Sequence, residues 1–261
     1  MPNIRASLAA FLCVAFIGLP GVARADELAT IMKAKVIKIA VPQDFAPFGS
    51  AGPDLKPQGL DVDMANLIGK KLGVKVEIVA VSSANRIPYL QTKKVDLVIS
   101  SLGKNAERAK VIDFSNAYAP FFSGVFGVKA LKVTKAADLA GKTIGATRGA
   151  IEEQELTKMV PKSATVKRFE DNNATISAFV SGQVDLIATG NVVAAAISAK
   201  NPSRPAALKF LIKNSPCYVG MNKGEPALMG KINAIIAQAK SDGDLNKLSE
   251  KWLHNPLPPG F

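Results

Sequence analysis

Histidine and cysteine are almost absent from this chain of 261 residues, which contains one histidine and two cysteines. The histidine, His254, lies near the C-terminus, so neither a histidine-based metal site nor a Ser–His–Asp triad can be assembled convincingly. The sequence also lacks a Gly-x-Ser-x-Gly turn, a Walker phosphate loop and a dinucleotide-binding glycine motif. These absences argue against catalysis and lead us to expect neither a cofactor nor a bound metal.

Apart from one segment near the N-terminus, the sequence has no apolar run that could cross a bilayer. That segment has the parts of a secretory signal peptide: a positive charge at Arg5, an apolar stretch from 6 to 19, and a small-x-small cleavage site at 23–25. The alternative is a membrane anchor, but the stretch is shorter than the roughly 20 residues that span a bilayer. No lipobox surrounds Cys13. We therefore expect residues 1–25 to be removed and the protein to be free in the periplasm.

An internal disulfide is also excluded, because removal of the signal peptide leaves Cys217 as the one thiol. A lone cysteine is more often a small buried hydrophobe than a nucleophile. The loss of Arg5 and Arg24 lowers the formal net charge from +12 to +10. Because the lysines are scattered singly and without interleaved aromatic residues, we expect a solvated basic surface that attracts anionic ligands, and no nucleic-acid site.

Two stretches of the chain echo each other, KVDLVISS at 94–101 and QVDLIATG at 183–190. Each contains a short apolar run that follows a helical segment and ends in small polar residues, as buried parallel strands do. Ligands of open α/β sheets bind at the carboxyl ends of such strands. The repeat therefore predicts two α/β lobes that face each other across a ligand-binding cleft.

The first half of the mature chain has a βαβαβ pattern, which is typical of a parallel sheet with right-handed crossovers. We expect strands at 36–41, 74–79 and around Asp96, a helix that Asp61 caps, and a short helix at 86–91. The second half repeats the pattern, with strands at 142–146, 165–169 and around Asp185, and with helices at 152–159 and 174–180.

Two amphipathic helices near the C-terminus follow a strand at 218–221 and have no sheet of their own. The economical arrangement is that they return to cover the first lobe, so that the chain crosses between the lobes twice. Two extended crossings form a hinge. The expected organisation is lobe 1 at 26–121 and 221–261, lobe 2 at 122–220, and hinge crossings near 121–126 and 216–220.

The segment after the first repeat can form a cradle for an anion. It supplies hydroxyls from Ser100 and Ser101, the small Gly103, and the N-terminus of a short helix that Asn105 would cap. Arg108, one turn inside this helix, adds a planar guanidinium that matches a carboxylate. Spacing alone, however, favours an ordinary strand–helix turn with an arginine on the surface.

Other segments can line the cleft. Arg86 opens the helix before the first repeat, although the pattern alone favours a surface position for it. Phe45 and Phe48 lie in the loop after the first strand, and one could be core while the other covers an apolar part of a ligand. The turn at 145–152, which includes Arg148, could supply the second lobe's half of the cradle or be a plain turn.

A series of motifs occurs in an order and at spacings that are specific for one family. The motifs are APF (46–48), GLDVDMA (59–65), KVDLVI (94–99), ER (107–108), DFS (113–115), DLAGKTIG (138–145), SGQVD (181–185), DG (242–243) and KW (251–252). The whole mature chain thereby resembles family 3 of the extracellular solute-binding proteins, the polar amino-acid binding proteins of bacterial ABC importers. NRIP at 85–88 and the tail KWLHNPLPP at 251–259 resemble the glutamate/aspartate-type branch.

The resemblance implies a two-lobed type II periplasmic binding protein fold, in which each lobe is a mostly parallel sheet flanked by helices. It also implies that Arg108 holds the α-carboxylate of the ligand and that Arg86 and Ser83 lie near its distal group. Phe45 would line the wall of the first lobe. The other residues of the expected ligand site are Ser101, Leu102 and Gly103 in the first lobe and Arg148, Ala150, Ile151 and Asn191 in the second.

Three positions depart from the family pattern. Gly190 replaces the acid that usually holds the ammonium of the ligand, the usual Gly-Thr-Thr turn is GAI at 149–151, and the hydroxyl often found at Gly103 is absent. An ammonium that is buried without a charged partner is costly. An α-amino acid would therefore need another acid, such as Glu152 or Glu153, unless the ligand is a carboxylate without an α-amine.

These observations predict a monomeric periplasmic receptor that closes around an amino acid or a related carboxylate and delivers it to an ABC permease. The alternative is an enzyme on the same fold, because a dehydratase branch of the cyclohexadienyl type, acting on prephenate or arogenate, resembles this family. In that case Glu152 would be a general acid/base whose pKa is raised by burial.

Overall fold

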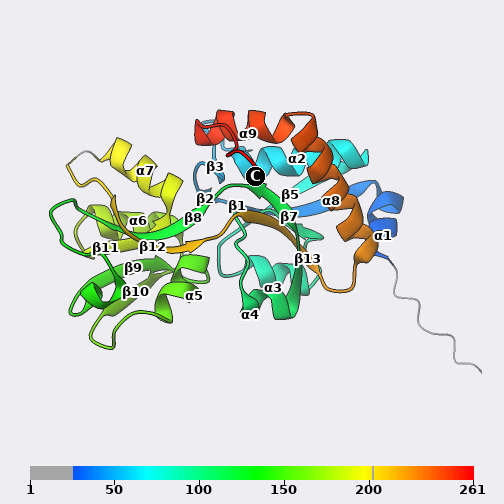
Figure 1. Cartoon of the computed structure of the whole chain (residues 1–261). Coiled ribbons are helices and arrows are strands. Elements are labelled where there is room, and N and C mark those ends of the chain that lie inside the picture. Colours follow the sequence, from blue (N-terminus) through cyan, green and yellow to red (C-terminus); the bar gives the residue numbers. More distant parts are fainter. Residues whose placement is uncertain (1–25, 202) are drawn as a thin grey trace, which may run out of the picture.

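The computed structural model describes residues 26–201 and 203–261, so the expected signal peptide lies outside the described residues. Two five-stranded sheets, each flanked by helices, lie side by side as two lobes (Figure 1). A small third sheet follows the first strand and consists of β2 (Asp44–Phe45), β3 (Gly49–Ala51) and β4 (Pro57–Gln58). The architecture is the two-lobed α/β arrangement that the sequence predicts.

The sheet of the first lobe has the strand order β5-β1-β6-β13-β7. Its strands are β1 (Val36–Pro42), β5 (Lys75–Val81), β6 (Leu97–Val98), β7 (Ile112–Ala119) and β13 (Cys217–Asn222). β1 pairs in parallel with β5 and β6, whereas β13 pairs antiparallel with β6 and β7. Within this sheet β13 alone runs against the other strands, so the expectation of a mostly parallel sheet is confirmed.

The sheet of the second lobe has the order β10-β9-β11-β8-β12 and the same plan. Its strands are β8 (Phe122–Gly127), β9 (Thr143–Thr147), β10 (Thr165–Phe169), β11 (Leu186–Gly190) and β12 (Ala207–Asn214). β9 pairs in parallel with β10 and β11, and β8 lies antiparallel between β11 and β12. The two sequence repeats thus end in β6 and β11, which occupy the same place in their two sheets.

Helices cover the faces of both sheets, as buried parallel strands require. The first lobe carries α1 (Glu27–Ala34), α2 (Leu60–Leu72), α3 (Arg86–Gln91), α4 (Ala106–Val111), α8 (Pro226–Ser241) and α9 (Asp244–Leu253). The second lobe carries the 3₁₀ turn η1 (Ala136–Leu139) and α5 (Ile151–Thr157), α6 (Asn172–Val180) and α7 (Asn191–Lys200). α8 packs against β7 and α9 packs against α2, so the C-terminal helices do return to the first lobe.

The apolar periodicity of these helices explains their packing. Met64, Ile68 and Leu72 of α2 are buried, as are Leu228 and Ile232 of α8, and all five belong to one core cluster. Burying such a side chain stabilises the fold by about 1.5–3 kcal/mol relative to leaving it in water. Among the described residues, no helix combines the length and the apolar character that a bilayer crossing needs.

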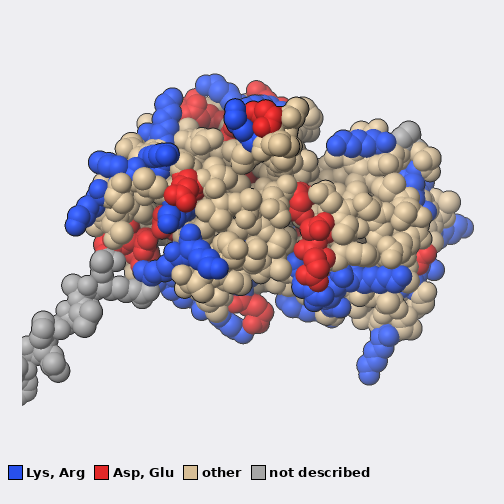
Figure 2. All heavy atoms as spheres, turned by 180° about the vertical axis from the view of Figure 1, so that it is seen from behind, with Lys and Arg blue, Asp and Glu red and all other residues tan. Residues whose placement is uncertain are grey.

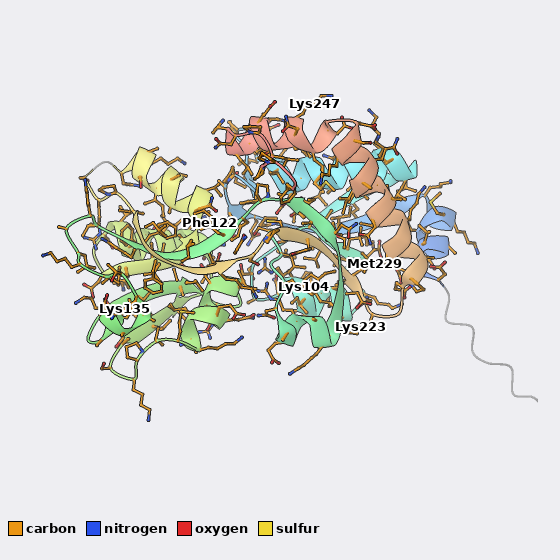
Figure 3. The ribbon with its side chains drawn as sticks, viewed as in Figure 1. Lys104, Phe122, Lys135, Lys223, Met229 and Lys247 are labelled. Carbon is orange, nitrogen blue, oxygen red and sulfur yellow. The ribbon has the colours of Figure 1, made fainter. Side chains whose placement is uncertain are left out.

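The chain passes between the lobes twice, between β7 and β8 and again between β12 and β13. Phe122 marks the point where β8 enters the second lobe (Figure 3). The backbone N–H of Ser215 donates to the carbonyl oxygen of Phe121 at 3.1 Å, which joins the two crossings. Short paired crossings of this kind allow two lobes to rotate as bodies.

The start of α2 differs from the expectation that Asp61 caps it. The helix begins at Leu60 after Gly59, whose φ of 139° is accessible to glycine. The carboxylate of Asp61 is buried and accepts hydrogen bonds from the Ser101 backbone N–H and the Tyr118 hydroxyl, both at 2.6 Å. Asp61 therefore ties α2 to the segment that follows β6, the predicted ligand segment.

The buried Asp61 should make stability fall as the pH rises. Burial raises the pKa of Asp61 from 3.8 to about 7, against the opposing hydrogen bonds of Tyr118 and Ser101. The unfolded carboxyl therefore loses its proton first, so the stabilisation is complete below pH 3.8 and is lost between pH 3.8 and about 7. At about 1.4 kcal/mol per pKa unit, the loss is on the order of 4 kcal/mol.

The variant Asp61→Asn removes this titration. We expect its free energy of unfolding, measured with urea from pH 4 to pH 8, to fall less over this range than that of the unsubstituted protein. Parallel pH profiles for the two proteins would contradict the assignment.

Candidate functional site

Three charged side chains from both lobes meet where the strands end. Arg86 of α3 and Arg108 of α4 come from the first lobe, and Glu152 of α5 comes from the second. Their exposed fractions are 3%, 3% and 4%. We call these three residues the junction cluster. Charges buried to this extent need opposite charges or hydrogen bonds around them.

Arg108 connects the two lobes. Asn105 caps α4 by accepting the N–H of Arg108 at 2.9 Å, which fixes the first turn and directs the guanidinium inward. Its Nη1 donates to the Gly103 carbonyl oxygen at 2.7 Å, and its Nη2 donates to the Gly149 carbonyl oxygen of the second lobe at 2.9 Å. The surface position that spacing alone favours is therefore wrong.

Among the described residues, none accepts a hydrogen bond from the buried Nε of Arg108. Burial, together with repulsion from Arg86, lowers the pKa of Arg108 to about 9, while Glu152 acts in the opposite direction. The guanidinium is therefore charged at neutral pH. One of its donor groups is free for a partner from outside the chain.

Arg86 is also buried, although the sequence pattern favours the surface. Its Nη1 donates to the carbonyl oxygen of Ser100 just after β6, and its Nε has no hydrogen-bond partner among the residues described. Burial lowers the pKa of Arg86, whereas the negative charges of Glu152 and Asp61 raise it. The side chain therefore lies between an acid of its own lobe and an acid of the other.

Glu152 is the acid that the second lobe contributes. It lies in the first turn of α5, and its buried Oε1 has no hydrogen-bond partner in the part of the chain that the structure describes. Burial raises the pKa of Glu152, and the charges of Arg86 and Arg108 lower it. Glu153, by contrast, pairs with Arg168 at 2.6 Å on the second lobe. Of the two acids that the sequence left open, the structure brings Glu152 to the junction.

The backbone after β6 completes the first-lobe side. Ser101, Leu102 and Gly103 are all buried beside the junction cluster. Ser101 has a φ of 39°, a left-handed value that is sparsely populated by residues other than glycine. The hydrogen bond from its N–H to Asp61 holds it there.

Three aromatic rings pack together near the first crossing. Phe45 and Phe48 stack with ring centroids 5.8 Å apart, and Phe121 of the first crossing contacts both rings at 6.3 and 5.6 Å. Phe48 is fully buried, whereas Phe45 retains 7% of its exposed area. Of the two phenylalanines, Phe45 is thus the one with surface left for a ligand.

The turn at Gly149 forms the opposite wall. Its φ of 75° and its packing both require glycine, because a Cβ there would lie 2.7 Å from the Ala84 Cα and 3.0 Å from the Ser83 carbonyl oxygen. Ala150 and Ile151 are buried, and a Cβ at Gly103 would come within 3.2 Å of the Ile151 side chain. Residues from both lobes therefore touch around the junction cluster.

A family model described as "Bacterial extracellular solute-binding proteins, family 3" matches residues 37–255. The chain belongs to this family. The predicted resemblance is thereby confirmed, while the glutamate/aspartate-type branch stays a prediction.

Several relatives of this solute-binding protein are named for the amino acids that they bind. The ABC transporter glutamine-binding protein GlnH of Bacillus subtilis is 29% identical over 233 residues, which cover 87% of this chain and 85% of that protein. The solved solute receptor for L-cysteine of Neisseria gonorrhoeae has a TM-score of 0.81 at 32% identity and covers 87% of this chain and 93% of its own. A solved ancestral amino acid-binding protein, AncCDT-1, described as a precursor of cyclohexadienyl dehydratase, has a TM-score of 0.79 at 32% identity, over 86% of this chain and 98% of its own.

Such neighbours also establish the type II fold of this solute-binding protein.

Two of the expected site residues lie away from the junction cluster. Arg148 is exposed and pairs with Glu170 on the surface at 2.8 Å. Asn191 is half-buried, accepts the N–H of Phe122 at 3.3 Å and lines hollows beside the C-terminal tail. Neither side chain contributes to the junction in this structure.

Gly190, at the position of the family's usual acid, has no room for a side chain. A Cβ at Gly190 would overlap the ring of Phe121. The aromatic ring thus fills the space into which a residue at position 190 would extend. This packing explains why the acid is missing there, and it leaves Glu152 as the acid of the junction.

Polar contacts between the lobes were not evident from the sequence. Asp44 of β2 accepts the N–H of Asn172 at the start of α6 at 2.6 Å, and Asn105 donates to Gln154 and Glu155 at 2.9 Å. Asp44 and Asn172 are both buried. A helix N-terminus provides unpaired N–H groups that attract an acid. The contact of Asp44 with the start of α6 could therefore have been predicted only from the presence of an acid and a helix start in the sequence. These contacts hold the lobes together on either side of the junction cluster.

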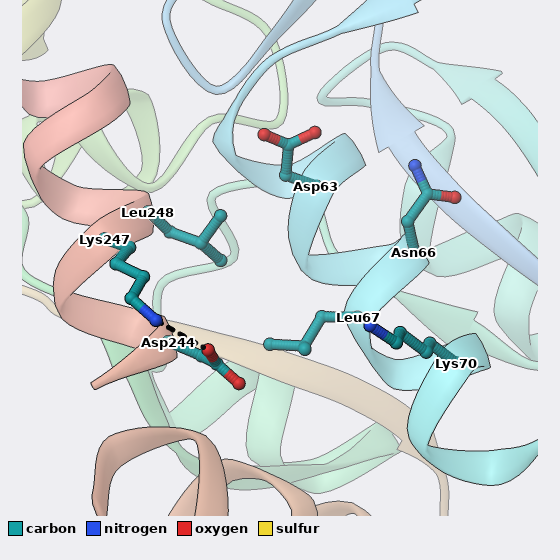
Figure 4. A pocket seen from close by; sticks show the side chains of 7 residues that line it. All are labelled: Asp63, Asn66, Leu67, Lys70, Asp244, Lys247 and Leu248. Carbon is teal, nitrogen blue, oxygen red and sulfur yellow. Dashed lines mark ion pairs between the residues drawn. The ribbon is translucent and has the colours of Figure 1, made fainter. Parts of the chain in front are cut away.

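Surface hollows lie elsewhere. One of about 310 Å³ is lined by α2 and α9 of the first lobe and contains the Asp244–Lys247 ion pair (Figure 4). Another of about 520 Å³ lies between α7 and the C-terminal segment that includes Trp252.

The charges on the surface agree with the sequence analysis. Lysine and arginine are spread over both lobes on the face seen in Figure 2 and do not gather in one patch. Within the described part of the chain, no group of three His, Cys, Asp or Glu side chains is placed to hold a metal ion.

Proposed function

We propose that this chain is the periplasmic receptor of an ABC importer and that it binds a polar or acidic amino acid between its lobes. The observation that carries the proposal is that Arg108 of one lobe and Glu152 of the other are both buried and close enough for each to shift the pKa of the other. A buried cation from one lobe and a buried acid from the other each keep a hydrogen-bonding atom without a partner.

The charges of the junction cluster match a zwitterion. Arg86 and Arg108 are positive groups of the first lobe, and Glu152 is a negative group of the second lobe that acts on both arginines. A carboxylate would meet Arg108, and an ammonium would meet Glu152. Arg108 and Glu152 would then each have a counter-charge, which lowers the penalty of burying them.

A ligand held in this way would stabilise the closed state. Arg108 contacts the second lobe through Gly149, and Glu152 faces the first lobe, so a bound amino acid would contact both bodies at once. A ligand shifts a conformational equilibrium by its difference in affinity for the two states. We propose that the closed monomer is the form that the permease recognises.

The unpartnered Nε of Arg86 lies on the same side as Arg108 and would meet a polar or acidic side chain of the ligand. The amino acids in the names of the relatives, glutamine and L-cysteine, are of polar type. A screen of amino acids, keto acids and dicarboxylates by thermal shift should identify the ligand, because a true ligand binds the native state and raises the Tm with concentration.

Arg108→Ala should weaken binding by about 3–5 kcal/mol, the usual effect of removing one partner of a buried charge pair. The measurement is calorimetric titration with the amino acid that the screen identifies. Arg148→Ala is the matched control, because Arg148 is exposed and paired with Glu170, and its affinity should stay unchanged. Equal affinities for both variants and the unsubstituted protein would exclude this site.

Glu152→Gln should change selectivity. A neutral amide does not compensate an ammonium, so affinity for the α-amino acid should fall about 10- to 100-fold. The affinity for the corresponding α-hydroxy acid, which has no ammonium, should fall less. Glu153→Gln is the control, since Glu153 pairs with Arg168 away from the junction. If the amino acid binds the Glu152→Gln variant as it binds the unsubstituted protein, Glu152 does not hold the ammonium.

A second function is favoured by the environment of Glu152. A buried carboxyl with a raised pKa is suited to proton transfer, and the structural neighbour AncCDT-1 is described as a precursor of a dehydratase. If the chain is such an enzyme, incubation with prephenate at neutral pH releases phenylpyruvate, which is followed by its absorbance. We expect no turnover, and turnover that Glu152→Gln abolishes would replace the receptor proposal with the enzyme.

A further inference from the structure

A buried hydroxyl on the hinge has no hydrogen-bond partner within residues 26–201 and 203–261. Ser215 lies on the second crossing, and its side chain retains 2% of its exposed area. Its backbone N–H donates to Phe121 on the first crossing, but its Oγ makes no hydrogen bond. A buried hydroxyl without a partner is unfavourable by about 1–3 kcal/mol, so its presence calls for a ligand or another explanation.

The Oγ of Ser215 points at the backbone that Arg108 uses. A Cβ added to Gly103 would overlap this Oγ, so the hydroxyl occupies the space next to the Gly103 Cα. The carbonyl oxygen of the same Gly103 accepts from Nη1 of Arg108 at 2.7 Å. Arg108 and Ser215 therefore approach one residue from two directions, and both present an unpartnered donor.

The surroundings place this hydroxyl where the lobes and the hinge converge. Ile151 of the second lobe also lies beside Gly103, 3.2 Å from the position of that added Cβ. Lys213, on the crossing just before Ser215, donates to the carbonyl oxygen of Lys104 at 2.8 Å, and Figure 3 labels Lys104 in the region where the two lobes approach each other. The segment around Ser215 thus belongs to the wall of the ligand site.

We propose that Ser215 is a ligand-positioning residue: its Oγ donates to the carboxylate that Arg108 binds. The hydroxyl reaches the site from the hinge because Gly103 leaves it room. The contact would also link the ligand to both crossings through the hydrogen bond from Ser215 to Phe121. This inference rests on the proposed function, since it takes the carboxylate at Arg108 as given.

The test is a swap of the hydroxyl between two positions. Ser215→Ala removes the donor and should lower affinity about 10- to 100-fold, the range for a hydrogen bond to a charged group. Gly103→Ser alone forces its side chain against Ser215 and should also weaken binding. The double variant Gly103→Ser/Ser215→Ala has room for the new side chain and supplies a hydroxyl again. It should bind more tightly than either single variant.

The probes are the twenty common L-amino acids, each titrated by calorimetry, and every one that binds is carried through the series. Ser115→Ala is the control, because Ser115 is buried but bonds to Asn116 and Val219 within the protein. It should lower the Tm and leave the affinity unchanged.

The outcomes separate the two proposals. If the affinity losses of the two single variants add up in the double variant, or if Ser215→Ala binds with unchanged affinity, Ser215 does not position the ligand. A loss of affinity in Arg108→Ala would still support the receptor in that case. Unchanged affinity in Arg108→Ala, or no binding by any of the twenty, overturns both.

Discussion

The contact of Arg108 with carbonyl oxygens from both lobes is the interaction on which the rest of the structure depends. A guanidinium that is 3% exposed must be surrounded by acceptors, and here the acceptors come from Gly103 on one side and Gly149 on the other. The acceptors are complete only when the lobes are together. When the lobes close, the hydrogen bonds around this charge are therefore completed.

Two main-chain acceptors do not neutralise a cation, and Glu152 supplies the opposite charge from the second lobe. Because Phe121 fills the space beside Gly190, the family's usual acid has no place here, and the negative group comes from α5. This departure from the family pattern is local, because the acid missing at Gly190 is replaced by the acid Glu152 from a different element, α5. The acid at the junction can thus come from another element while the two sheets stay the same.

Much of this architecture could be predicted because it follows from apolar periodicity. The helix at 86–91 and the strand at 165–169 have the predicted bounds, and β6 and β11 end where the repeats indicate. β12 was missed, since its half-exposed residues, including Leu208 at 48% and Leu211 at 57%, show no clear alternation. α7 was missed as well, because its run of small residues has little amphipathic contrast.

The site was harder to predict than the fold. Arg86 and Arg108 each lie in a first helical turn, where a charged residue is ordinarily solvated. Their burial depends on contacts with residues distant along the chain, such as Gly149 of the second lobe beside Arg108, and no local pattern carries that information. Arg148 looked equally suitable in the sequence, yet it turns outward to Glu170. The family resemblance identified Arg108, and the structure was needed to separate Glu152 from Glu153.

The most direct measurement is a crystal structure of the protein with the amino acid that raises its Tm. The account predicts the carboxylate of that amino acid on the guanidinium of Arg108 and its ammonium within hydrogen-bonding distance of the Glu152 carboxylate. An amino acid seated outside the junction, or one whose ammonium faces another group while Glu152 still faces the arginines, would contradict it.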